Sequence, residues 1–301
     1  MTAIDERAVV FTCQGHELLG IVASPGQGPV HRVGVVVVVG GPQYRAGSHR
    51  HFTLLCRHLA SLGVASLRFD YRGSGDSGGP PLIGVEGAEA DIRAATDSLM
   101  RAQPQLQGVV LWGLCGAASA SALYAPDDKR VLGLVMLNPW VRTEEGLAKT
   151  RLKHYYLERL GDRDFWGRMA RGEVALASSL RALGANLLQA TGLGAARSDG
   201  APALEETQPK PRRVASVGSL PERMLASLNL TGLPTLVILS GQADLTANEF
   251  RELVGSSPAW QRWLALHQVQ RHDIEDSNHT FSRADWRDRV NELTTLWVLG
   301  L

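Results

Sequence analysis

The sequence predicts an α/β fold in which a mostly parallel sheet carries helices on both faces. Short apolar runs alternate with helical patterns through the first half of the chain. One of these runs, residues 33–39, consists of valine at every position except Gly34. A continuous run of β-branched residues is typical of a strand buried on both faces, as the strands of parallel sheets are. The strand–helix–strand order then predicts that successive strands run parallel.

The elements of the first half follow in order. Two stretches, residues 8–13 and 17–22, flank Gln14 and Gly15 and predict a hairpin. Helices and strands alternate after the valine-rich run. The expected elements are a helix at 52–62, a strand at 64–69, a helix at 85–102, a strand at 109–112, a helix of small residues at 115–124 and a strand at 131–137.

This alternation is interrupted at the Asn-Pro-Trp sequence of residues 138–140. From there to Gly232 the pattern is mostly helical. A tract near 191–213 is rich in Gly, Ala, Pro and charged residues, which is the composition of a mobile loop. An insertion of this kind between two strands of a sheet predicts a helical cap or lid at 138–232.

Beyond the insertion the sheet pattern resumes, with strands at 234–239 and 269–274 and a closing helix at 283–299. These strands and this helix are expected to belong to the same sheet and layers as the elements of the first half. We therefore expect a core made of residues 1–137 and 233–301.

Composition and charge narrow the functional classes. The chain has 301 residues, of which 44% are hydrophobic and 20% charged, a balance typical of globular proteins rather than disordered ones. Its 31 basic and 30 acidic residues leave a formal charge of +1. A nucleic-acid binder normally has a basic excess or a clustered basic face, so we expect no nucleic-acid partner.

The cysteine pattern indicates the cellular compartment, and the absence of metal-binding and dinucleotide-binding motifs indicates which cofactors to expect. Cys13, Cys56 and Cys115 cannot form a disulfide framework, and none belongs to a CxxC pair. The first residues lack the apolar core of a signal peptide, and the longest apolar run is too short to cross a bilayer. We expect a cytoplasmic protein without a membrane span. No His/Asp pair stands at metal-ligand spacing and no GxGxxG follows a strand, so neither metal nor cofactor is expected.

Three polar residues stand just beyond the carboxyl ends of predicted strands, where α/β folds place their functional sites. Cys115 lies in a tight turn between the strand that runs into Gly113 and a helix that opens with small residues. Asp244 follows the strand at 234–239, and His279 precedes the last helix. The helix N-terminus directs N–H groups and partial positive charge at the thiol, which favours a reactive thiolate.

The order nucleophile, acid, histidine along the chain resembles that of the α/β-hydrolase superfamily. Gly113-Leu114-Cys115-Gly116-Ala117 resembles its nucleophile elbow, with Cys in place of the usual Ser and Ala in place of the second Gly. The sequence DYRGSGDS at 70–77 resembles the turn after the fourth strand of many members. Dienelactone hydrolases and polyester synthases also carry Cys at the elbow, so the cysteine is compatible with an active enzyme.

Within the superfamily, the sequence resembles the exosortase A system-associated hydrolase group. The similarity rests on GGPQYRAGSHR at 40–50, WGLCGAASA at 112–120, NPW at 138–140 and the HYY…FW segment of the insertion. This resemblance implies the hydrolase fold and an acyl-transfer site. It implies no particular substrate.

The catalytic roles follow from the chemistry of the three side chains. His279 is expected to take the thiol proton of Cys115, or to pair with the thiolate as an imidazolium, while Asp244 orients the imidazole. Asp273 and Asp276 are rival acids. Both lie so near His279 on the same strand or loop that Asp244 is better placed.

The expected oxyanion hole combines two loops. One donor is the N–H of Gly116, the residue after the nucleophile. The other comes from the loop after the valine-rich strand, and because Pro42 has no N–H, Gln43 or Gly41 must supply it. Substrate contacts are expected from three further residues, Arg45, Leu114 and Trp140. Arg45 either clamps an anionic group or is solvated, as loop arginines commonly are.

The leading functional hypothesis is hydrolysis of an ester or thioester through an acyl-cysteine intermediate. Because an acyl thioester also reacts with amines, alcohols and thiols, an acyltransferase is the first alternative. A catalytically silent binding protein on the same fold is the second. The expected partner is a small acyl ester or thioester, free or carrier-bound, and the sequence leaves the acyl group and the oligomeric state open.

Overall fold

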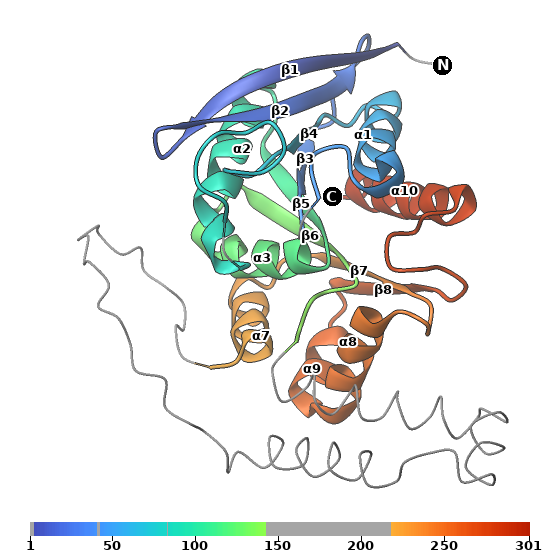
Figure 1. Cartoon of the computed structure of the whole chain (residues 1–301). Helices are drawn as coiled ribbons and strands as arrows, with labels where there is room; N and C mark the ends of the chain where they lie inside the picture. The colour runs from blue at the N-terminus through green and yellow to red at the C-terminus, as the bar shows by residue number, and fades with distance from the viewer. Residues whose placement is uncertain (1–2, 41–42, 83, 143–217) are drawn as a thin grey trace, which may run out of the picture. The chain divides into compact units, whose positions relative to one another are not determined.

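The computed structural model describes residues 3–40, 43–82, 84–142 and 218–301. In these ranges eight strands form one sheet in the order β1-β2-β4-β3-β5-β6-β7-β8 (Figure 1). The pairs β1–β2 and β2–β4 are antiparallel, and all pairs from β4 to β8 are parallel. The predicted α/β class with a mostly parallel sheet is confirmed.

The N-terminal hairpin consists of β1 (Ile4–Cys13) and β2 (His16–Pro25). Cys13 pairs with His16, so the turn holds only Gln14 and Gly15, both with positive φ angles of 48° and 81°. Two-residue turns with positive φ match the twist of the flanking strands. The hairpin is therefore confirmed, and each strand is four residues longer than the sequence pattern indicated.

Four of the six parallel strands are buried throughout, whereas β8 at the edge of the sheet is largely exposed. Every residue of β3, β4, β5 and β7 is buried, as continuous apolar runs predict. Their bounds are β3 (Val33–Val38), β4 (Ser66–Phe69), β5 (Gly108–Leu114), β6 (Val131–Leu137), β7 (Thr235–Ser240) and β8 (Val269–Ile274).

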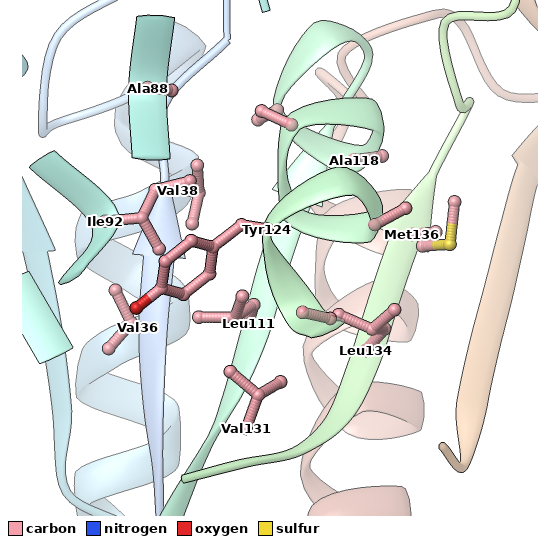
Figure 2. Packing of buried hydrophobic residues seen from close by; sticks show 14 of the residues in the cluster. Val36, Val38, Ala88, Ile92, Leu111, Ala118, Tyr124, Val131, Leu134 and Met136 are labelled. Carbon is pink, nitrogen blue, oxygen red and sulfur yellow. The ribbon is translucent and has the colours of Figure 1, made fainter. Parts of the chain in front are cut away.

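Helices cover both faces of the sheet (Figure 1). One core cluster joins the sheet to α1 (His51–Ser61) and α10 (Ala284–Leu299). The other joins it to α2 (Glu89–Ala102) and α3 (Gly116–Tyr124), and Figure 2 shows Ile92 and Tyr124 of these helices beside the strands. Three short 3-10 helices, Ser48–Arg50, Glu86–Ala88 and Ala125–Asp127, lie in the connections.

Within residues 218–301 the structure describes three helices besides α10. α7 (Leu220–Thr231) begins at a capping box and packs against α3. α8 (Leu245–Ser256) and α9 (Pro258–Leu264) connect β7 to β8 and were not predicted from the sequence. The described part of the chain contains no helix long and apolar enough to span a membrane.

The predicted cap is described only at its two ends. Residues 143–217, including the tract near 191–213, lie outside the described residues. At the C-terminal end of the insertion, α7 packs against α3 and α9.

Candidate active site

Cys115 occupies a sharp turn between β5 and α3. Its φ and ψ angles are 60° and −124°, a conformation that is strained for any residue with a Cβ. The turn brings the helix close to the strand, because a Cβ on Gly113 would lie 2.5 Å from the carbonyl carbon of Ala117. This is the geometry expected of a nucleophile elbow. The thiol is half-buried at the N-terminus of α3.

The acid and the histidine meet beside this turn. Nδ1 of His279 lies 2.9 Å from Oδ2 of Asp244. Asp244 is the N-cap residue of α8, where its Oδ1 accepts a hydrogen bond from the backbone N–H of Thr246. The hydroxyl of Ser240, at the end of β7, donates to Oδ2 over 2.6 Å. The carboxylate is therefore held from three directions and is buried.

The rival acids are placed differently. Asp273 is exposed and accepts from Arg251 and Arg271, and Asp276 is exposed as well. Of these three carboxylates, Asp244 is the one that contacts His279, and its catalytic role stays a prediction.

The proton affinity of His279 reflects its two neighbours. A hydrogen bond with Asp244 and, second, one with the Cys115 side chain raise the pKa of His279 to about 10, against the lowering effect of burial. His279 is therefore an imidazolium at neutral pH. Burial raises the pKa of Asp244, but the hydrogen bonds from His279 and Ser240 outweigh it, and the pKa falls below its usual value. The imidazole of His279 thus hydrogen-bonds to Asp244 and interacts with the side chain of Cys115.

The predicted oxyanion donors are only partly described. Gly116 opens α3, so its N–H belongs to the first helical turn, whose amides have no acceptor within the helix. The loop after β3 lies against the elbow, because a Cβ on Gly40 would stand 2.5 Å from the carbonyl oxygen of Leu114. Gln43 follows in that loop, and its buried Oε1 has no hydrogen-bond partner among the described residues. Gly41 lies outside them.

The three residues predicted to contact the substrate are bound or buried within the fold. The guanidinium of Arg45 pairs with Asp70 and Asp76, so its charge is already balanced within the fold and an anion-clamping role gains no support. Leu114 is buried in the sheet core. The backbone N–H of Trp140 donates to the carbonyl oxygen of Cys115 over 3.3 Å, which places this residue beside the elbow.

Sequence reasoning missed two polar residues of this region, Ser240 and Asn138. Ser240 ends β7 and Asn138 directly follows β6, and a polar residue at the carboxyl end of a buried strand was the available signal. Within the described ranges no cluster of three His, Cys, Asp or Glu residues is suited to hold a metal ion.

No protein-family model and no curated protein matches the sequence. Solved structures do match over nearly the full length. An esterase of Pyrococcus furiosus is 16% identical, with a TM-score of 0.60 over 98% of this chain and 92% of the esterase. An α/β serine hydrolase without lid from Xanthomonas campestris is 17% identical, with a TM-score of 0.54 over 97% of this chain and 95% of the other. The chain has the α/β-hydrolase fold.

A dienelactone hydrolase from Anabaena variabilis shares this fold, with 14% identity and a TM-score of 0.57 over 99% of this chain and 98% of the hydrolase. The fold-level part of the predicted resemblance is therefore confirmed. Membership of the exosortase A system-associated group stays a prediction.

Proposed function

We propose that the chain is an enzyme that hydrolyses an ester or thioester through an acyl intermediate on Cys115. The observation that carries this proposal is the placement of His279, which hydrogen-bonds to Asp244 and interacts with the side chain of Cys115. Nδ1 of the imidazole faces the carboxylate, which leaves Nε2 for the sulfur. A nucleophile, a base and a group that orients the base are the parts that covalent acyl transfer requires.

The electrostatics of the site favour a charged nucleophile. The imidazolium of His279 and the N-terminus of α3 both stabilise negative charge on the sulfur. His279 either takes the thiol proton as the sulfur attacks or pairs with the thiolate as an imidazolium.

The reaction follows in two steps. The thiolate attacks the carbonyl carbon, a C–S bond forms, and the carbonyl electron pair moves onto an oxygen that the N–H of Gly116 and a donor of the loop after β3 stabilise. Collapse of this intermediate breaks the bond to the leaving group, which takes the proton of His279. Water then attacks the acyl-cysteine with His279 as base, and the sulfur leaves as thiolate with the free acid as product.

The comparisons support hydrolase function in general. The matched structures include an esterase and a dienelactone hydrolase, both proteins whose names denote hydrolysis of ester bonds. The mechanism through cysteine rests on the residues of this chain.

Acyl transfer is the second candidate, and the residue type at the elbow favours it. A thioester intermediate is more reactive toward amines and thiols than an ester on serine is, so an acceptor other than water can take the acyl group from Cys115. The same site and the same first step serve both functions.

Intact mass spectrometry with a panel of acyl esters and acyl thioesters tests the proposal. We expect an acyl adduct that maps to Cys115, no adduct on the Cys115→Ala variant, and turnover of that variant at the buffer background. Cys56→Ala is the matched control, because it removes a thiol that is buried in the core. Wild-type turnover by Cys115→Ala, or an adduct elsewhere, would overturn the mechanism.

Product analysis separates the two candidates. Free acid as the only product in the presence of amine, alcohol and thiol acceptors supports hydrolysis, and an acylated acceptor supports transfer. Absence of both adduct and turnover, with Cys115 no more readily alkylated than Cys13 and Cys56, would favour a silent binding protein.

A further inference from the structure

The residues at the end of β6 contact Cys115 and His279 and are connected to Asp244 through Ser240. Residues 137–140, named here the β6 exit segment, hold the backbone of the nucleophile on both sides. The carbonyl oxygen of Leu137 accepts from the N–H of Cys115 over 2.8 Å, and the N–H of Trp140 donates to the carbonyl oxygen of Cys115 over 3.3 Å. The elbow is therefore fixed to this segment as well as to its own strand and helix.

Asn138 joins the same segment to the acid and the histidine. Its side chain is fully buried. Its Nδ2 donates to the backbone carbonyl oxygen of His279 over 3.0 Å, and its Oδ1 accepts from the backbone N–H of Ser240 over 2.8 Å. Ser240 in turn donates its hydroxyl to Asp244. One amide thus connects the backbone of the histidine loop to the strand end that positions the acid.

The residue type suits this position for two reasons. One end of the side chain must donate to a carbonyl and the other must accept from an N–H, and among short side chains asparagine provides both. The backbone of Asn138 has a φ of 42°, in the left-handed region that asparagine tolerates better than other residues with a Cβ. Its own N–H donates to the carbonyl oxygen of Ile238 over 3.0 Å, so backbone and side chain bind the same strand.

We propose that Asn138 is a positioning residue that holds the loop of His279 so that the imidazole lies between Cys115 and Asp244. It acts through His279 and does not contact the substrate. Where turnover is concerned, the inference rests on the proposed function. Where the reactivity of Cys115 is concerned, it needs no substrate at all.

The test measures the rate at which iodoacetamide alkylates Cys115, mapped by peptide mass, across a pH series. Asn138→Gly removes both side-chain bonds and keeps a residue that accepts the left-handed backbone. We expect alkylation at neutral pH to fall about 10-fold to 100-fold, because a small displacement of a partner group costs this much. In a His279→Ala background, Asn138→Gly should cause no further loss.

Asn138→Asp provides a second variant of nearly identical shape. The ionised carboxylate still accepts from Ser240 but repels the carbonyl oxygen of His279, so alkylation at neutral pH should fall. The protonated carboxyl can donate again. The ratio of variant rate to wild-type rate should therefore rise toward one as the pH is lowered, which a general loss of stability would not produce.

Tyr124→Phe is the matched control. It removes a buried side-chain hydrogen bond, from Tyr124 to Asp128, at the other end of the sheet. It should lower the resistance to urea and leave the alkylation profile unchanged.

The inference is wrong if Asn138→Gly unfolds at lower urea concentration but keeps the wild-type alkylation profile. It is equally wrong if the loss is the same in the presence and absence of His279. If no ester or thioester is turned over while alkylation depends on His279 and Asn138 as described, the proposed function fails and the positioning role stands.

Discussion

At the scale of single residues, the charge state of His279 is central to the proposed chemistry. Its imidazole shares hydrogen bonds with a buried carboxylate and with the sulfur, and both raise its pKa, to about 10. Asp244 can remain ionised at that depth because His279, Ser240 and Thr246 all donate to it. The proton on the His279 imidazole therefore affects both the stability of the fold and the reactivity proposed for Cys115.

The first prediction concerns stability against pH. Because the pKa of His279 rises from 6.5 to about 10 on folding, its contribution to the free energy of unfolding is complete below about pH 6.5 and is lost as the pH rises to about 10. Urea unfolding of the wild type should weaken across this window more steeply than unfolding of His279→Ala. Burial also raises the pKa of the Cys13 thiol to about 12. This thiol therefore lowers the free energy of unfolding at high pH by the same amount in both proteins. Parallel curves for the two proteins would contradict the prediction.

The second prediction distinguishes the acids. Asp244→Asn removes the charge that orients the imidazole, so kcat on the substrate found by the mass-spectrometric panel should fall about 10²- to 10⁴-fold. Asp273→Asn serves as the control, because Asp273 is exposed and pairs with arginines instead. Equal losses in the two variants would remove the special role of Asp244.

At the scale of elements, the elbow depends on the closeness of β5 and α3. A Cβ on Gly113 would lie 2.5 Å from the carbonyl carbon of Ala117 and 2.6 Å from the backbone nitrogen of Ala118. These are backbone atoms of a packed helix, which cannot move aside like the end of a long side chain. The strained conformation of Cys115 is therefore maintained by the packing of two elements.

The third prediction compares two glycines. Gly113→Ala should lower the free energy of unfolding by about 1–3 kcal/mol through overpacking, and it should also slow alkylation of Cys115 because α3 must shift. Gly255 lies in α8 with open space around it, so Gly255→Ala should raise the free energy of unfolding by about 0.4–1 kcal/mol. Urea denaturation measures both, and a neutral Gly113→Ala would show that the elbow tolerates a wider spacing.

Elements that rest on local pattern could be predicted from the sequence, and contacts between distant elements could not. The valine-rich run identified β3, and the small residues around Cys115 identified the elbow. The role of Asn138 depends on backbone groups 102 and 141 residues away, which strand register alone brings together. Arg45 was predicted to face the substrate, but the sequence did not reveal that the buried Asp70 binds its guanidinium.

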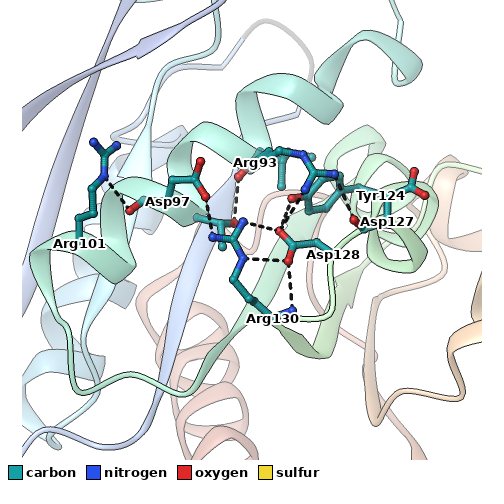
Figure 3. A network of polar contacts seen from close by, with 9 residues as sticks. Arg93, Asp97, Arg101, Tyr124, Asp127, Asp128 and Arg130 are labelled. Atoms are coloured by element: carbon teal, nitrogen blue, oxygen red, sulfur yellow. Dashed lines mark hydrogen bonds and ion pairs between the residues drawn. The ribbon is translucent and has the colours of Figure 1, made fainter. Parts of the chain in front are cut away.

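At the scale of the whole sheet, chemistry and stability lie at opposite ends. The proposed triad follows the carboxyl ends of β5, β7 and β8. A polar network lies before the amino end of β6, where Asp128 binds Arg130 and Tyr124, and Arg130 also pairs with Asp97 (Figure 3). Strands of seven residues separate the two ends by about 20 Å. The strained turn at Cys115 thus lies at one end of the sheet, and this network of ion pairs and hydrogen bonds lies at the other.

The fourth prediction follows from this separation. Burial raises the pKa of Asp128, but hydrogen bonds from Arg130 and Tyr124 outweigh it and lower the pKa to about 2. The contribution of Asp128 to stability is therefore complete above about pH 3.8 and is lost as the pH falls to about 2. Arg130→Gln should cost about 2 kcal/mol of unfolding free energy at neutral pH, since hydrogen bonds to charged groups contribute about 1.5–3 kcal/mol, and acid unfolding should begin at a higher pH. Alkylation of Cys115 should keep its wild-type rate and pH profile, because the sheet between the two ends is rigidly packed. A change in that profile would mean that the amino end of the sheet is coupled to the site, and stability and reactivity would then have to be treated as one property of the fold.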